Sequence, residues 1–194
     1  MLYPLNDYAE YDTFVTLQIQ RRFVMKRKHP ANLFVRDCIT TALFNLMKKK
    51  DYREITVSEI VKTAGVSRNS FYRNYQSIED IIRQHMTERT EKWWAEYMAN
   101  LHPHVIEETF QHFLDMKELI QLLYKANLSY LLMEHIFICG KQSLTGELHN
   151  TYQTAFTSGG LWGLTNEWVI RGMKESPKEM EALFRMQGQQ SNKT

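Results

Sequence analysis

The side chains best suited to chemistry lie in one short polar stretch, residues 67–75, which reads Ser-Arg-Asn-Ser-Phe-Tyr-Arg-Asn-Tyr. Arg68 and Asn69 carry the paired hydrogen-bonding groups that recognise guanine and adenine edges in the major groove of DNA. Phe71 and Tyr75 are spaced to reach a core instead. The remaining polar groups suit phosphate oxygens, and they belong to Ser70, Tyr72, Arg73 and Asn74. Taken singly, each of these residues is also typical of an ordinary solvated surface.

Two short helices with defined ends position this stretch. Thr56 and Glu59 have the spacing of a capping box, in which the threonine hydroxyl accepts from the Glu59 amide and the glutamate accepts from the Thr56 amide. Gly65 supplies the left-handed residue that ends the first helix, and Ser67 caps the second. Two capped helices joined by a glycine-containing turn predict a helix-turn-helix. Thr56 and Ser67 therefore join the candidate DNA-binding residues.

Positive charge is concentrated around the same elements. Residues 21–76 contain 13 Lys and Arg against four acids, a net +9, whereas residues 1–20 carry −3 and residues 77–194 carry −4. A basic block favours a polyanionic partner, because neutralised phosphates release counterions. A basic face exposed only to solvent gives the same pattern. Together with the polar stretch, the charge predicts double-stranded DNA as the partner.

The rest of the sequence predicts an all-α fold. Apolar residues recur at helical spacing, and no stretch alternates with period two. Beyond the two short helices, we expect helices over residues 34–49, 77–100, 104–114, 115–126, 128–140, 147–173 and 177–187, about nine in total. The expected organisation is an N-terminal extension over residues 1–30, a helix-turn-helix domain over 31–77 and a second helical domain over 78–194.

Residues 55–75 and the following Ser-Ile-Glu-Asp at 77–80 resemble the tetracycline-repressor-like (TetR/AcrR) transcriptional regulators. The resemblance covers residues 33–85, with caps, turn glycine and tyrosine in register. Two positions depart from the pattern: Asn69-Ser70 replaces a small residue and threonine, and Ile78 replaces the usual lysine. The resemblance implies a cytoplasmic homodimer on a palindromic operator, with a C-terminal ligand-sensing and dimerisation domain. It implies a repressor released by a small effector.

Glycines interrupt an apolar helical surface in the C-terminal half. Each costs about 1 kcal/mol relative to alanine in a helix, so a cluster favours close approach by another helix, in a dimer or inside the protomer. The stretch from Ser158 to Trp168, followed by Ser-Pro-Lys-Glu-Met at 176–180, also resembles a subset of these regulators, some linked to dihydroxyacetone-kinase operons. The predicted dimer interface comprises Phe156, Gly159, Gly160, Trp162, Gly163 and Trp168.

The helices between Glu107 and Gln142 carry more apolar side chains than a DNA-binding unit needs. Core packing explains most of them, but helical domains often enclose a cavity. The candidate pocket for a small apolar effector comprises Phe110, Phe113, Met116, Leu123, Met133 and Phe137. The alternative is a regulator controlled by, or acting through, a protein partner, such as a dihydroxyacetone-kinase-type activator.

Motifs for catalysis and for metal binding do not occur in the sequence. It contains no HExxH, CxxC pair, P-loop or GxSxG, so we expect neither an enzyme nor a bound metal or cofactor. Cys38 and Cys139 lie in apolar helical patterns typical of buried thiols in a reducing cytosol. No apolar run reaches the roughly 18 residues of a membrane span. We therefore expect a cytoplasmic protein without a membrane partner.

Overall fold

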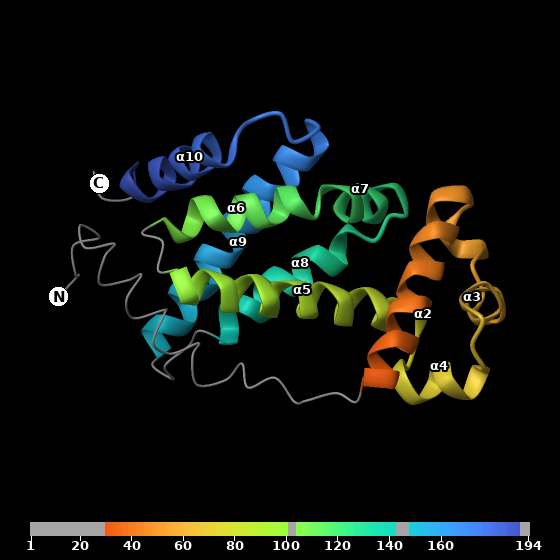
Figure 1. Ribbon diagram of the computed structural model, residues 1–194. Helices are drawn as coiled ribbons and strands as arrows, with labels where there is room; N and C mark the ends of the chain where they lie inside the picture. The colour runs from red at the N-terminus through yellow and green to blue at the C-terminus, as the bar shows by residue number, and fades with distance from the viewer. Residues whose placement is uncertain (1–29, 101–103, 143–147, 191–194) are drawn as a thin grey trace. The chain divides into compact units, whose positions relative to one another are not determined.

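The computed structural model describes residues 30–100, 104–142 and 148–190 (Figure 1). These residues form nine α-helices and one 3-10 turn, and none of them is in a strand, which confirms the predicted all-α fold. No helix in these ranges is long and apolar enough to cross a membrane. The expected N-terminal extension lies outside the described residues, except for Pro30.

The helices follow the predicted order closely. Their bounds are α2 (Pro30–Lys49), η1 (Tyr52–Glu54), α3 (Val57–Ala64), α4 (Arg68–Asn74), α5 (Ile78–Asn100), α6 (Val105–Asp115), α7 (Lys117–Lys125), α8 (Ser129–Gln142), α9 (Leu148–Ile170) and α10 (Pro177–Gln190). The helix expected to reach residue 173 stops at Ile170. It stops there because Gly172 adopts a left-handed φ of 91° and turns its amide back to the carbonyl of Val169, at 2.9 Å.

The described helices pack as two compact units, each built from segments that are distant in sequence. One, the helix-turn-helix unit, comprises the described residues 30–90 and 118–135. The other, the C-terminal unit, comprises the described residues 91–100, 104–117, 136–142 and 148–190. Consequently α5 and α8 each contribute residues to both units.

The helix-turn-helix unit has a core made by its first four α-helices. α2 packs against α3 and α4, and these helices lie side by side in Figure 1. Leu43, Ile60, Phe71 and Ile81, one from each of α2 to α5, have no exposed surface. Burying each such side chain stabilises the fold by about 1.5–3 kcal/mol. This core supports the outward face of α4.

Residues Glu118–His135 belong to the helix-turn-helix unit although they come much later in the chain. Four of their apolar side chains have no exposed surface, those of Ile120, Leu123, Leu131 and Leu132. Ion pairs join them to the N-terminal part of the unit: Lys48 Nζ lies 2.6 Å from Glu118 Oε1, and Arg83 Nε lies 3.0 Å from Glu134 Oε2. The unit is thus completed by α7 and the first half of α8.

The C-terminal unit has an aromatic core. Phe110 of α6 and Trp168 of α9 meet edge to face, with ring centroids 5.7 Å apart. Trp168 is 1% exposed, and its Nε1 donates to the carbonyl of Glu175 at 3.1 Å. α10 packs on α6 and starts at a capping box, in which Glu179 Oε2 accepts from the Ser176 amide at 2.7 Å. The Ser176 cap therefore sets the start of this last helix.

Candidate nucleic-acid interface

The turn between α3 and α4 has the geometry that its sequence predicts. Thr56 Oγ1 accepts from the Glu59 amide at 3.3 Å, and Glu59 Oε2 accepts from the Thr56 amide at 3.0 Å. Gly65 is left-handed, with φ 66° and ψ 30°, and the Val66 amide returns to the Val61 carbonyl at 3.0 Å. This left-handed residue ends α3 and lets the chain turn into α4.

The recognition helix α4 divides into a buried and an exposed side. Phe71 and the Tyr75 that follows the helix are 0% and 2% exposed, as their spacing predicted. Tyr72 is 62% exposed. The other exposed side chains on this face belong to Ser67, Arg68, Asn69 and Arg73, while Ser70 and Asn74 are half-buried. The structure therefore brings the candidate side chains together on one short helix.

Several of these side chains already make hydrogen bonds within the helix-turn-helix. Ser67 Oγ accepts from the Ser70 amide at 3.1 Å and lies 3.0 Å from Ser70 Oγ. Asn74 Nδ2 donates to the Ser70 carbonyl at 2.7 Å, and Thr56 is committed to its capping box. Arg68 donates to Ser58 Oγ at 2.5 Å. Arg68 must release this contact, or share it, if it is to reach a base.

Two exposed side chains of α4 have no polar partner among the described residues. Asn69 and Arg73 make no hydrogen bond or ion pair with any residue that the structure describes. They differ in chemistry, because the asparagine amide both donates and accepts whereas the guanidinium only donates. An amide can pair with the N6 and N7 of adenine, and a guanidinium suits a phosphate as well as guanine.

This helix-turn-helix corresponds to a known family. Residues 39–84 match the family described as "Bacterial regulatory proteins, tetR family". The helix-turn-helix of this chain is a TetR-family domain. The matched domain supports a DNA-binding transcriptional regulator, as the sequence resemblance implied. No curated protein matches the sequence.

A solved structure gives a second comparison for this protein. The structure named "Dihydroxyacetone kinase operon activator DhaS" is similar to it with a TM-score of 0.50 and 16% sequence identity. The similarity covers 77% of this chain and 91% of that one. At this identity the likeness concerns the fold.

The predicted dimer-interface residues fall into two groups. Trp168 lies in the core of its own protomer, whereas Phe156 is 75% exposed. Gly160 and Gly163 are exposed, and a Cβ at either position would meet no described atom within 4 Å. Gly159 and Trp162 are half-buried.

The tight helix approach inside the C-terminal unit lies at another glycine. A Cβ added at Gly140 of α8 would collide with Ser158 Oγ of α9. Gly140 was not among the predicted residues, because a single glycine near the end of a helix gives little signal. Gly160 and Gly163 do not serve this internal contact, so their lack of side chains leaves room on an outer surface of α9.

The six candidate pocket residues do not belong to one unit. Phe110, Phe113, Met116 and Phe137 are part of the C-terminal unit, whereas Leu123 and Met133 are part of the helix-turn-helix unit. Met133 and Phe137 are half-buried and the other four are buried. A pocket within the C-terminal unit would therefore be lined by the four candidates that belong to it, Phe110, Phe113, Met116 and Phe137.

One group of potential metal ligands occurs among the described residues: ligand atoms of His104, Glu107 and Glu181 lie within 4.8 Å of one another. Glu181 is 7% exposed, and its Oε1 accepts from Arg185 at 2.7 Å. The same oxygen lies 3.6 Å from His104 Nδ1. Since a guanidinium already neutralises the buried carboxylate, we interpret the group as an ion-pair cluster that joins α6 to α10.

The residues that support the recognition helix from behind were not predicted from the sequence. Lys50 Nζ pairs with Glu59 Oε1 at 2.7 Å, and together with bonds from Thr56 it lowers the pKa of the Glu59 carboxyl. Arg36 of α2 is 5% exposed and bonds to α5. A signal existed for Arg36, because it precedes Ile39 by three residues and so interrupts the apolar face of its helix.

Proposed function

We propose that this TetR-family protein is a cytoplasmic homodimer that binds a palindromic operator through α4 and represses transcription until a small effector releases it. The observation that carries DNA reading is the exposed polar face of α4, which stands on a capped turn inside the +9 block. Recognition helices of a two-fold pair reach successive major grooves about 34–36 Å apart. A palindromic site follows from that symmetry.

Replacing Asn69 by alanine tests base reading. We expect the variant to lose preference at one base position in each half-site, at a cost of about 1–3 kcal/mol, because the amide pairs with a base edge. Tyr72→Phe is the matched control on the same helix, and it should weaken all sequences alike if its hydroxyl binds phosphate. Competition binding against single-base operator variants measures both. An unchanged preference for both Asn69→Ala and Arg68→Ala would exclude α4 as the reading helix.

An apolar stripe on α9 supports the homodimer. Tyr152, Phe156 and Ile170 are 70%, 75% and 64% exposed. They lie on one face of the helix together with Gly160 and Gly163. Successive members of this set are three, four or seven residues apart, and residues at these spacings share a helix face. Apolar side chains at this exposure favour association, and glycines in the same stripe let a second helix come close. The proposed partner is the same stripe of a second copy.

Two buried polar atoms in the C-terminal unit support a bound effector. Trp94 Nε1 and Thr165 Oγ1 have no hydrogen-bond partner among the residues that the structure describes. Trp94 is 8% exposed and Thr165 is 0% exposed. An unpaired buried donor costs about 1–3 kcal/mol, so such atoms call for a ligand or ordered water. The proposed effector therefore combines apolar surface with hydrogen-bonding groups.

Thr165→Val tests this reading without knowledge of the effector. Removing an unpaired hydroxyl should raise the free energy of unfolding of the free protein by about 1 kcal/mol, because its desolvation cost disappears. Thr157→Val, at a half-buried position on the same helix, should change it by less than about 0.5 kcal/mol. Urea unfolding measures both. A clear destabilisation by Thr165→Val would mean that the hydroxyl is already satisfied and marks no site.

A protein partner in place of the small effector is the second candidate. The structural likeness is to a protein named as an operon activator, and the exposed α9 stripe suits a protein surface as well as a second copy. The two candidates differ in one measurement. If a thermal-shift screen of small molecules stabilises nothing, while a partner protein changes operator binding, control is protein-mediated.

A further inference from the structure

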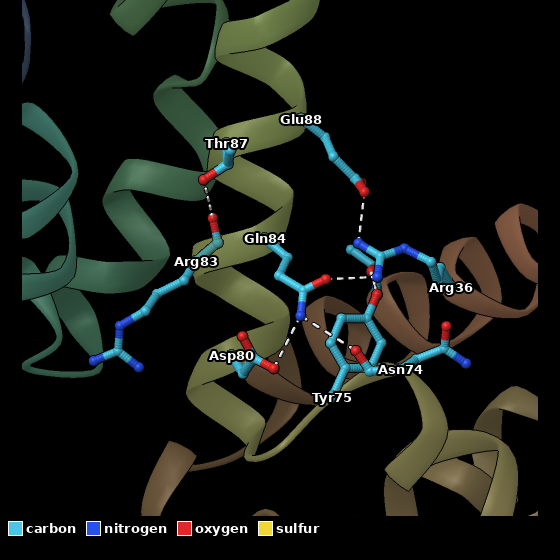
Figure 2. A network of polar contacts seen from close by, with 9 residues as sticks. Arg36, Asn74, Tyr75, Asp80, Arg83, Gln84, Thr87 and Glu88 are labelled. Atoms are coloured by element: carbon cyan, nitrogen blue, oxygen red, sulfur yellow. Dashed lines mark hydrogen bonds and ion pairs between the residues drawn. The ribbon is translucent and has the colours of Figure 1, made fainter. Parts of the chain in front are cut away.

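A polar network in the helix-turn-helix unit begins at the buried Arg36 of α2. Its two terminal nitrogens donate to Gln84 Oε1 and to Glu88 Oε1, both at 2.5 Å (Figure 2). Its guanidinium carbon lies 4.9 Å from the centre of the Tyr75 ring. Tyr75 is the residue that ends the recognition helix. Arg36 thus connects α2 to α5 and to the end of α4.

The side-chain amide of Gln84 extends the network to the main chain of α4. Arginine can only donate, so Arg36 requires the oxygen of that amide and turns its nitrogen the other way. Gln84 Nε2 then donates to the carbonyl of Asn74 at 3.2 Å and to Asp80 Oδ2 at 2.9 Å. Asn74 is the last residue of α4, where carbonyls lack partners within the helix. Gln84 supplies that partner, as Figure 2 shows.

Asp80 fixes the connection that follows α4. Its Oδ2 accepts from the amide of Gln76 at 2.9 Å, and its own amide donates to Ser77 Oγ at 3.1 Å. The same carboxylate oxygen accepts a hydrogen bond from Gln84 Nε2, so this one atom links the segment after α4 to the Arg36–Gln84 network. The chain from Asn74 to Ser77 is therefore held by side chains of α5.

We propose that Arg36 and Gln84 are positioning residues that set the orientation of α4 for base reading, through the amide orientation that Arg36 imposes on Gln84. The inference rests on the proposed function of α4. A helix of seven residues forms few internal hydrogen bonds and depends on contacts at its ends. The N-terminal end is held by the Ser67 cap, and the network holds the C-terminal end. None of the network atoms needs to touch DNA.

Gln84→Glu separates the acceptor role of this side chain from its donor role. The carboxylate keeps an acceptor for Arg36 but has no donor, and it faces the Asn74 carbonyl and the Asp80 carboxylate. We expect its affinity for the selected operator to fall about tenfold more than its affinity for unrelated DNA, because only specific binding requires the α4 orientation. Faster hydrogen exchange at the Gln76 amide should accompany this loss.

Two control variants isolate the effect. Thr87→Glu adds the same charge at an exposed position three residues further along α5, so it should weaken specific and non-specific binding equally. Glu88→Gln keeps an acceptor for Arg36 and leaves the Gln84 amide with its donor contacts, so it should leave the ratio of the two affinities unchanged.

The outcomes distinguish the inference from the function on which it rests. If Gln84→Glu matches Thr87→Glu in the ratio of affinities, or leaves exchange at Gln76 unchanged, the positioning role is overturned while DNA reading stands. If the wild-type protein shows no preference for any DNA sequence, the proposed function fails, and the inference fails with it.

Discussion

Phe156→Asp is expected to convert the protein to monomers and to lower its affinity for a palindromic operator by about a hundredfold or more. The side chain is 75% exposed in the single chain and would be covered in the dimer. A two-fold interface contains the substitution twice, so two carboxylates would have to leave water. Each unpaired buried carboxylate costs several kcal/mol. Light scattering and operator titration measure the two effects.

Gly160 provides a second variant that separates folding from association. A Cβ there meets no described atom within 4 Å, so Gly160→Leu fits the single chain and should stabilise α9 by up to about 1 kcal/mol. The same side chain should overpack a helix of the partner and weaken the dimer by about 1–3 kcal/mol. Ala95→Asp, exposed on α5, is the charge control for Phe156→Asp. Unaltered dimers in both stripe variants would place the interface elsewhere.

Phe71→Ala is expected to lower the free energy of unfolding of the helix-turn-helix unit by about 3–5 kcal/mol. The ring has no exposed surface, and its removal leaves a cavity in addition to the lost burial. The neighbouring Tyr72→Ala is the matched control, since Tyr72 is 62% exposed. It should change unfolding by less than about 0.5 kcal/mol, yet weaken DNA binding.

Urea unfolding followed by circular dichroism, with parallel DNA titrations, measures both variants. A loss below about 1 kcal/mol for Phe71→Ala would contradict the burial of its ring. Equal destabilisation by the two variants would contradict the division of α4 into a core side and a DNA side.

The ends of the short helices could be predicted because their causes are local. The capping box joins residues three apart in sequence, Thr56 and Glu59, and Gly65 ends its helix through its own φ. Nothing distant is needed for either. The same holds for the Ser176 cap of the last helix.

The burial of single residues on α9 could not be predicted in this way. The helix is apolar on more than one face, so periodicity does not say which face meets the core. Trp168 packs on Phe110, whereas Phe156 stays outside, and the difference comes from which helix packs there. Arg36 illustrates the same limit, since its acceptors lie 48 and 52 residues away.

The position of Glu118–His135 within the helix-turn-helix unit bears on synthesis and on protein engineering. The ribosome makes residues up to Thr90 first, but the unit lacks α7 and half of α8 until residue 135 has emerged. Until then, the surface that those helices cover is open to chaperones or to aggregation. A chimaera joined after Thr90 would lack the same helices, so the same surface of the unit would stay uncovered. Exchange of C-terminal domains should therefore carry residues 118–135 along with the DNA-binding helices.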